Sequence, residues 1–214
     1  MLTKREEFNE QLVRLRSAAL WASWYYTIWI ALWPTEEVVS TLNLWKGFFG
    51  PVRSALHEMM FIHLSKLFDR DWRAVSLRRL LESAKGDSNL IPHANEKQLN
   101  EIEFRLSCLE NSQAWKIIKQ NRDQQLAHLD ANPLEKKPLI KKDFDNFRED
   151  IEWVFDQLFS MHDGSMWDSS YQAERSTWEA SELLRILREE ADHSAQRVSE
   201  IMRALQEGAD HPLV

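Results

Sequence analysis

The chain has 214 residues, of which 43% are hydrophobic and 29% charged, a balance that excludes a disordered chain and suffices for one domain with a substantial core. Only five glycines and six prolines interrupt it, and the remaining composition favours helix formers, which predicts an all-α protein. The single cysteine, Cys108, excludes an intramolecular disulfide and a cysteine-cluster zinc site, and it fits a reducing cytoplasm.

The net charge of −7 has the wrong sign for a general nucleic-acid binder, but it is unevenly distributed. Residues 143–214 carry a net charge of −11, whereas residues 1–142 carry +4. Basic residues are concentrated between Lys116 and Lys142, which predicts a local positive surface within an acidic protein. The alternative interpretation is that these lysines are solvated loop residues.

The spacing of apolar residues predicts a series of helices separated by short breaks. A first helix covers about 4–33 and ends at Pro34. A second begins after Thr35, is interrupted at Gly47, Gly50 and Pro51, and continues to about Phe68. Further helices are expected at about 77–81, 96–109, 113–129, 143–158 (capped by Asp143) and 171–205. No alternation typical of strands is present.

The longest uncharged run, Ser17–Trp33, is rich in tryptophan and could serve three purposes. It is long enough to approach a membrane span, but its aromatic residues prefer membrane interfaces to the hydrocarbon centre. No basic leader precedes it and no small-residue cleavage site follows, so a signal peptide is not expected. A buried central helix or a dimer face is favoured over membrane contact, and the whole chain is predicted to be cytoplasmic.

We expect residues 1–162 to form a helical bundle and residues 163–214 an acidic C-terminal helical extension. Residues spaced three and four apart form a heptad-like seam along this last helix: Leu184, Leu187, Ala191, Ser194, Val198, Ile201 and Leu205. Such a seam packs either on its own bundle or against a second copy, and the sequence leaves both possibilities open.

One short segment combines groups that suit chemistry on RNA: Arg122, Asp123 and His128. Arginine supplies a permanent cation for a phosphate, histidine a base that titrates near neutral pH, and aspartate a group that orients either. Lys116 and Lys119 lie just upstream and are predicted to bind RNA. The alternative is that Arg122 and Asp123 are exposed helix charges and that His128 pairs with a helix C-terminus.

Three segments together resemble the HEPN superfamily, and most closely its abortive-infection U-type branch. They are the helix that ends in Leu56–Arg70, the short Ser-Leu-x-x-Leu-Leu helix at Ser76–Leu81, and the helix that carries Arg122-Asp-x4-His128. The resemblance covers roughly residues 21–158. It implies an all-α bundle of about six helices with a long C-terminal helix, and a dimer whose two motifs face one cleft. It also implies that Arg122, Asp123 and His128 are the catalytic residues of a metal-independent endoribonuclease of toxin or phage-defence type.

Helix geometry makes a dimer physically sensible, because Arg122 and His128 would lie about 9 Å apart along a helix and about 120° apart around it. Two such helices crossing at a two-fold axis would place four groups around one cleft. His57 and His63 lack a third ligand, so no metal or other cofactor is expected. Glu58 and Asp69 are candidate partners of Arg122.

The expected partners are therefore RNA, a second copy of the chain, and an antitoxin or other defence protein, with no membrane. The alternative function is a non-catalytic helical dimer that binds a nucleotide, RNA or a partner protein through the same cleft.

Overall fold

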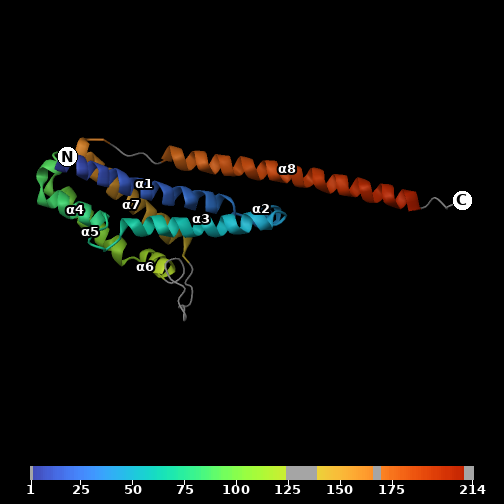
Figure 1. Ribbon diagram of the computed structural model, residues 1–214, viewed down its shortest axis with the longest axis horizontal. Coiled ribbons are helices and arrows are strands. Elements are labelled where there is room, and N and C mark those ends of the chain that lie inside the picture. Colours follow the sequence, from blue (N-terminus) through green and yellow to red (C-terminus); the bar gives the residue numbers. More distant parts are fainter. Residues whose placement is uncertain (1, 124–138, 166–169, 210–214) are drawn as a thin grey trace.

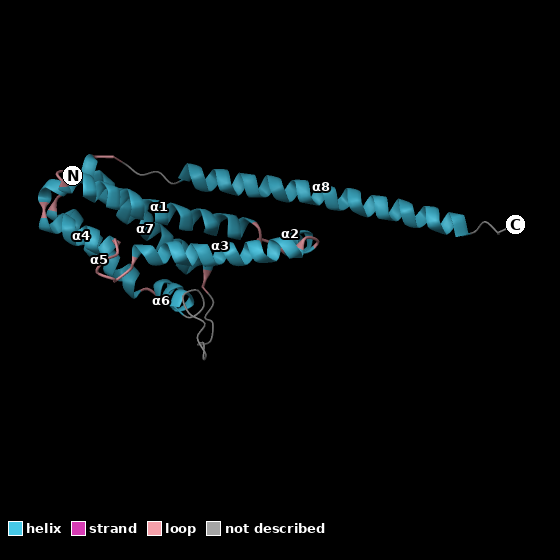
Figure 2. Cartoon of the chain, viewed as in Figure 1, coloured by secondary structure: helices cyan, strands magenta, loops and turns pink. Residues whose placement is uncertain are grey.

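The computed structural model describes residues 2–123, 139–165 and 170–209, and side chains at 2–123, 139–165 and 174–203. Every regular element in these ranges is helical, which confirms the all-α class and the long C-terminal helix (Figures 1 and 2). The elements are α1 (Lys4–Ala31), α2 (Glu36–Asn43), α3 (Lys46–Leu67), α4 (Leu77–Gly86), the 3₁₀ turn η1 (Ser88–Leu90), α5 (Glu96–Asn111), α6 (Gln113–Asn121), α7 (Lys141–Asp163) and α8 (Ser170–Ala209).

Helix α1 is the central element, and it lies lengthwise against α3 in Figure 1. Its start is fixed by a capping box, in which the Thr3 hydroxyl accepts from the Glu6 amide and the Glu6 carboxylate accepts from the Thr3 amide. Its buried face is narrow because Ala18, Ala19 and Ala22 have small side chains, which allow close helix packing. Within Ser17–Trp33 the residues that face the bundle, such as Ala18, Ala22 and Tyr26, are buried, whereas Trp21 is 44% exposed. No described helix is long and apolar enough to cross a membrane.

The break between α2 and α3 falls at Leu44 and Trp45, so the interruption predicted at Gly47, Gly50 and Pro51 is wrong. Pro51 lies inside α3, near its beginning. A proline there removes one backbone hydrogen bond, whose missing partner would be the carbonyl of Gly47. Both residues are exposed, so water can satisfy that carbonyl and the helix continues.

Helix α7 forms the other half of the core. It begins at Lys141 after Ile140, so Asp143 is in its first turn and is not the predicted cap. The carboxylate still lies near the positive end of the helix dipole. Apolar residues spaced three and four apart along it are all buried: Phe144, Phe147, Ile151, Val154, Phe155 and Leu158.

Polar contacts join the two ends of α7 to α1 and to η1. The Tyr26 hydroxyl donates to Asp145 over 2.7 Å, and burial followed by this carboxylate raises the pKa of Tyr26. At the other end, Arg5 donates to the backbone oxygen of His162 over 3.1 Å, and the buried His162 ring contacts the Leu90 oxygen through Nδ1 at 2.6 Å. The first and the seventh helices are therefore held together at both ends.

Helix α8 divides into a covered part and an uncovered part. Leu184 is buried in a small second core with Val38, Leu42 and Phe49, and Arg188 pairs with Glu37 at 3.2 Å. Farther along, Val198 and Ile201 are 57% and 60% exposed, where α8 extends past α2 in Figure 1. The seam thus packs on its own bundle only along its first part.

Candidate functional site at the end of helix α6

The short helix α6 positions the start of the candidate motif. Ser112 caps it by accepting from the Trp115 amide over 3.0 Å, which confirms the predicted break after Asn111. Ala114, Trp115, Ile117 and Ile118 are buried against the bundle, where α6 packs between α3, α5 and α7. This apolar face fixes the helix, so the polar residues at its C-terminal end project from a rigid support.

Regular α-helix ends at Asn121, and Arg122 and Asp123 begin a wider, π-type turn. The predicted continuous helix to Leu129 is therefore interrupted eight residues before its expected end. Such turns carry an extra residue within a helical ladder and are frequent at functional sites. The sequence does not predict this π-type turn, because the same residues are equally compatible with an ordinary α-helix.

Arg122 and Asp123 are in direct contact. The Asp123 Oδ1 atom accepts from Arg122 Nε over 2.6 Å and lies 2.5 Å from its second guanidinium nitrogen, Nη2. The side chains are 30% and 42% exposed, respectively, so the pair stands at the surface of the bundle. The same carboxylate oxygen thus accepts one hydrogen bond and lies within ion-pair distance of a second nitrogen, which holds the guanidinium and leaves other N–H groups free to donate elsewhere.

The two lysines predicted to bind RNA lie on the same side of α6 as Arg122. Lys116, Lys119 and Arg122 follow one another at intervals of three residues, which places them within an arc of about 120°. Both lysines are exposed. Because the C-terminal end of a helix is its negative pole, it favours cations there and does not itself attract phosphate. Any phosphate at this end must therefore be bound by the side chains.

His128, the third predicted catalytic residue, lies outside the described residues. The structure thus brings Arg122 and Asp123 together and places Lys116 and Lys119 beside them, while the position of His128 relative to this group stays a prediction. Glu58 and Asp69 have other partners: Glu58 accepts from the Ser54 hydroxyl over 3.4 Å, and Asp69 accepts from the Asp71 amide over 2.9 Å.

The histidines of α3 are in aromatic surroundings. The His57 ring lies 4.4 Å from that of Phe61, and the His63 ring lies 5.7 Å from that of Tyr25. Burial, followed by the nearby charge of Lys66, lowers the pKa of His63 and so disfavours its charged form. Within the described ranges no group of three or more His, Cys, Asp or Glu side chains could hold a metal ion.

The described residues form an all-α bundle. At the end of its short helix α6, an Arg–Asp pair lies beside two exposed lysines. These are the features that the HEPN resemblance implies for the described part of the motif. The family model of AbiU2, an abortive-infection HEPN family, matches residues 5–183, and the chain belongs to this family. The match includes all of α1 except its first residue, the whole motif segment and the beginning of α8, and it ends just before Leu184. Comparisons with curated proteins and with solved structures return no match.

Proposed function

We propose that the protein is a metal-independent endoribonuclease of phage defence, and that Arg122, Asp123 and His128 form its catalytic group. The observation that carries the proposal is membership of an abortive-infection HEPN family in a chain that keeps the Arg-Asp-x4-His motif. The held guanidinium of Arg122 and the neighbouring lysines support it, because they provide the positive charge that an RNA backbone requires.

The reaction would be a transesterification within the RNA strand. His128 removes the proton of a 2′-hydroxyl, the 2′-oxygen attacks the adjacent phosphorus, and the bond from phosphorus to the 5′-oxygen breaks. That oxygen takes up a proton, which leaves a 2′,3′-cyclic phosphate and a 5′-hydroxyl. Arg122 stabilises the charge that grows on the phosphoryl oxygens. Asp123 keeps the guanidinium of Arg122 in one orientation.

The test of this mechanism is RNA cleavage in EDTA by the wild-type protein beside His128→Ala. We expect the wild type to cut RNA without added metal and to leave 2′,3′-cyclic phosphate ends, whereas His128→Ala leaves the RNA intact. A DNA strand of the same sequence should not be cut, because it lacks the 2′-hydroxyl. Equal cleavage by both proteins would place the activity elsewhere, and no cleavage by either would favour the non-catalytic binding function.

The proposed cleft requires two copies of the chain. The family resemblance implies two motifs that face one cleft, and a two-fold axis would bring the two Arg122–Asp123 pairs and their His128 side chains to the same place. We expect light scattering at micromolar concentration to give twice the chain mass of 25.4 kDa. A monomer mass under conditions in which RNA is cut would contradict the shared cleft while leaving the chemistry intact.

A further inference from the structure

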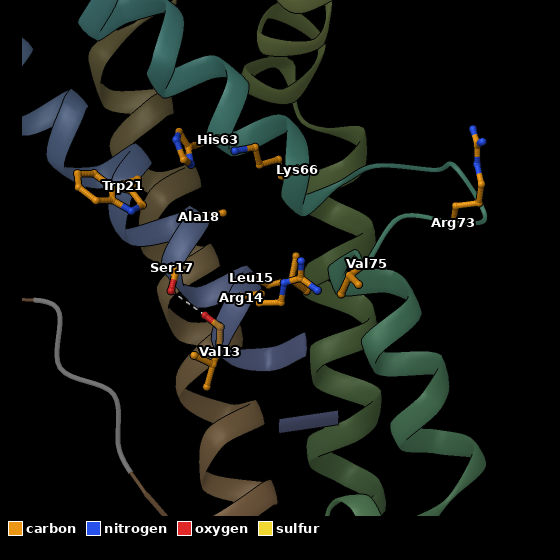
Figure 3. Close-up of a pocket in the computed structure, with 10 residues that line it drawn as sticks. All are labelled: Val13, Arg14, Leu15, Ser17, Ala18, Trp21, His63, Lys66, Arg73 and Val75. Carbon is orange, nitrogen blue, oxygen red and sulfur yellow. Dashed lines mark hydrogen bonds between the residues drawn. The ribbon is translucent and has the colours of Figure 1, made fainter. Parts of the chain in front are cut away.

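A surface groove with a volume of about 600 Å³ runs between α1, α3 and the segment that joins α3 to α4 (Figure 3). Its lining residues share one property, which is that none of them carries a carboxylate: Val13, Arg14, Leu15, Ser17, Ala18, Trp21, His63, Lys66, Arg73 and Val75. In a chain with a net charge of −7, a groove with three cations and no acid is electrostatically distinct from its surroundings.

Two of these cations, Arg14 and Lys66, have no carboxylate partner within the part of the chain that the structure describes. Nine of the sixteen described arginines lie within 4.0 Å of a carboxylate oxygen, and Arg14 is among the seven that do not. Arg73 is one of the nine, because Asp71 holds it through two hydrogen bonds, and Figure 3 shows it pointing away from the other lining residues. Arg14 and Lys66 therefore keep their charge available for an anion.

The end of the groove beside Lys66 is aromatic, and Arg14 lies away from it. Trp21 is 44% exposed, and its ring stacks on Tyr25 with centroids 5.8 Å apart and planes inclined by 27°. His63 completes the cluster at 6.4 Å from Trp21, and its lowered pKa keeps it from adding charge there. This end offers a supported ring system partly open to solvent, to which a flat ligand can stack.

The helical register sets the distance between the two ends. Arg14 and Trp21 are seven residues apart on α1, so they share a face and lie about 10 Å apart along the axis. Lys66 follows His63 by three residues on α3, which puts a second cation one turn from the aromatic cluster. In Figure 3 the Lys66 side chain points toward His63, Trp21 lies on the other side of His63, and Arg14 lies lower in the view, toward Val75.

We propose that this groove binds a nucleoside phosphate, with the base stacked on Trp21 and the phosphate held by Arg14 and Lys66. An aromatic platform combined with unpaired cations is the arrangement by which proteins bind nucleotide units without reading their sequence. The volume also lies within the range of small-molecule sites. The same chemistry would accept a free mononucleotide or one nucleotide of an RNA strand. The site is separate from Arg122, and its occupancy does not depend on RNA cleavage.

The experiment is calorimetric titration of the full chain with AMP, with inorganic phosphate and with adenosine. We expect AMP to bind at least tenfold more tightly than either of the other two probes, because only AMP engages both ends of the groove. Trp21→Leu should weaken AMP binding about tenfold or more, as expected when one stacking platform is lost. Arg14→Gln and Lys66→Gln should each weaken it at least fivefold.

Matched controls separate this site from general charge and ring effects. Lys97→Gln removes an exposed cation of α5, and Trp178→Leu removes a tryptophan of α8 that is 67% exposed; both should leave AMP affinity within twofold. Circular dichroism and Tm confirm that each variant is folded, and Arg14→Gln tests the site even if Trp21→Leu does not fold. AMP that binds no better than phosphate, or equally well to Arg14→Gln, overturns the proposal.

Two further measurements identify the source of the ligand and isolate the site from the motif. In the His128→Ala variant, which should leave RNA intact, a ribohexanucleotide that displaces labelled AMP at a lower concentration than unlabelled AMP does assigns the groove to an RNA strand, and one that needs a higher concentration assigns it to a free nucleotide. His128→Ala should bind AMP as the wild type does. Loss of AMP binding in that variant would place the nucleotide at the motif and contradict a separate groove.

Discussion

Replacement of Arg122 with lysine is expected to lower kcat for RNA cleavage by about 10²–10³-fold, the loss that follows removal of one donor to a developing oxyanion. Lysine keeps the positive charge. However, its single ammonium nitrogen cannot contact Asp123 as the guanidinium does and also present further N–H donors in one plane to a phosphate. Single-turnover cleavage of a short RNA measures the effect on the chemical step.

The matched control for this substitution is Arg197→Lys. Arg197 also pairs with a carboxylate, Glu190, over 2.7 Å, but it lies on the uncovered part of α8. We expect Arg197→Lys to cleave RNA at the wild-type rate. If Arg122→Lys is as active as this control while His128→Ala is inactive, Arg122 does not contact the reacting phosphate, and its role is limited to pairing with Asp123.

Replacement of Phe155 with alanine should lower the free energy of unfolding by about 3–5 kcal/mol. The ring is fully buried in the core between α7 and its neighbours, so its removal takes away apolar contacts and leaves a cavity. For a chain of this length the loss corresponds to a decrease in Tm of roughly 6–20 °C. Thermal unfolding followed by circular dichroism measures it.

Phe104→Ala is the control for that prediction, because it makes the same chemical change on α5 at a ring that is 69% exposed. A change within about 0.5 kcal/mol of the wild type is expected there. Equal destabilisation by the two substitutions would mean that Phe104 is covered in solution, as it would be in a dimer interface that includes this face of α5.

The parts of the fold that could be predicted are those governed by local chemistry. The caps at Asn95 and Ser112 and the buried stripe of α7 each follow from a few neighbouring residues, and each is found in the structure. The sequence predicts the break before α3 at the wrong residues. The free-energy cost of a proline depends on its position within the helix, and the composition around Pro51 does not give that position. The sequence predicts Asp143 as a cap, but its carboxylate lies in the first turn, where it interacts favourably with the same helix dipole.

The candidate site likewise has a part that the sequence predicts and a part that it does not. The type and order of Arg122 and Asp123 are evident from the sequence, and so is the basic surface of α6 beside them. The π-type turn and the sharing of one Asp123 oxygen by two guanidinium nitrogens depend on how α6 packs on α3 and α7. The groove at Arg14 and Trp21 was not predicted, because its two sides come from helices that are 40 residues or more apart in the sequence.

The contact between Arg5 and His162 affects the order in which the helices pack during translation. These residues are 157 positions apart, and α1 cannot complete its packing until α7 has been synthesised. At about 5–20 residues per second, translation from the end of α1 to the end of α7 takes on the order of ten seconds. During that interval the tryptophan-rich helix has only α3 and its neighbours to cover it, and Arg122 emerges before α7, one of the three helices against which α6 packs. The ribosome therefore delivers Arg122 and Asp123 before the support of α6 is complete.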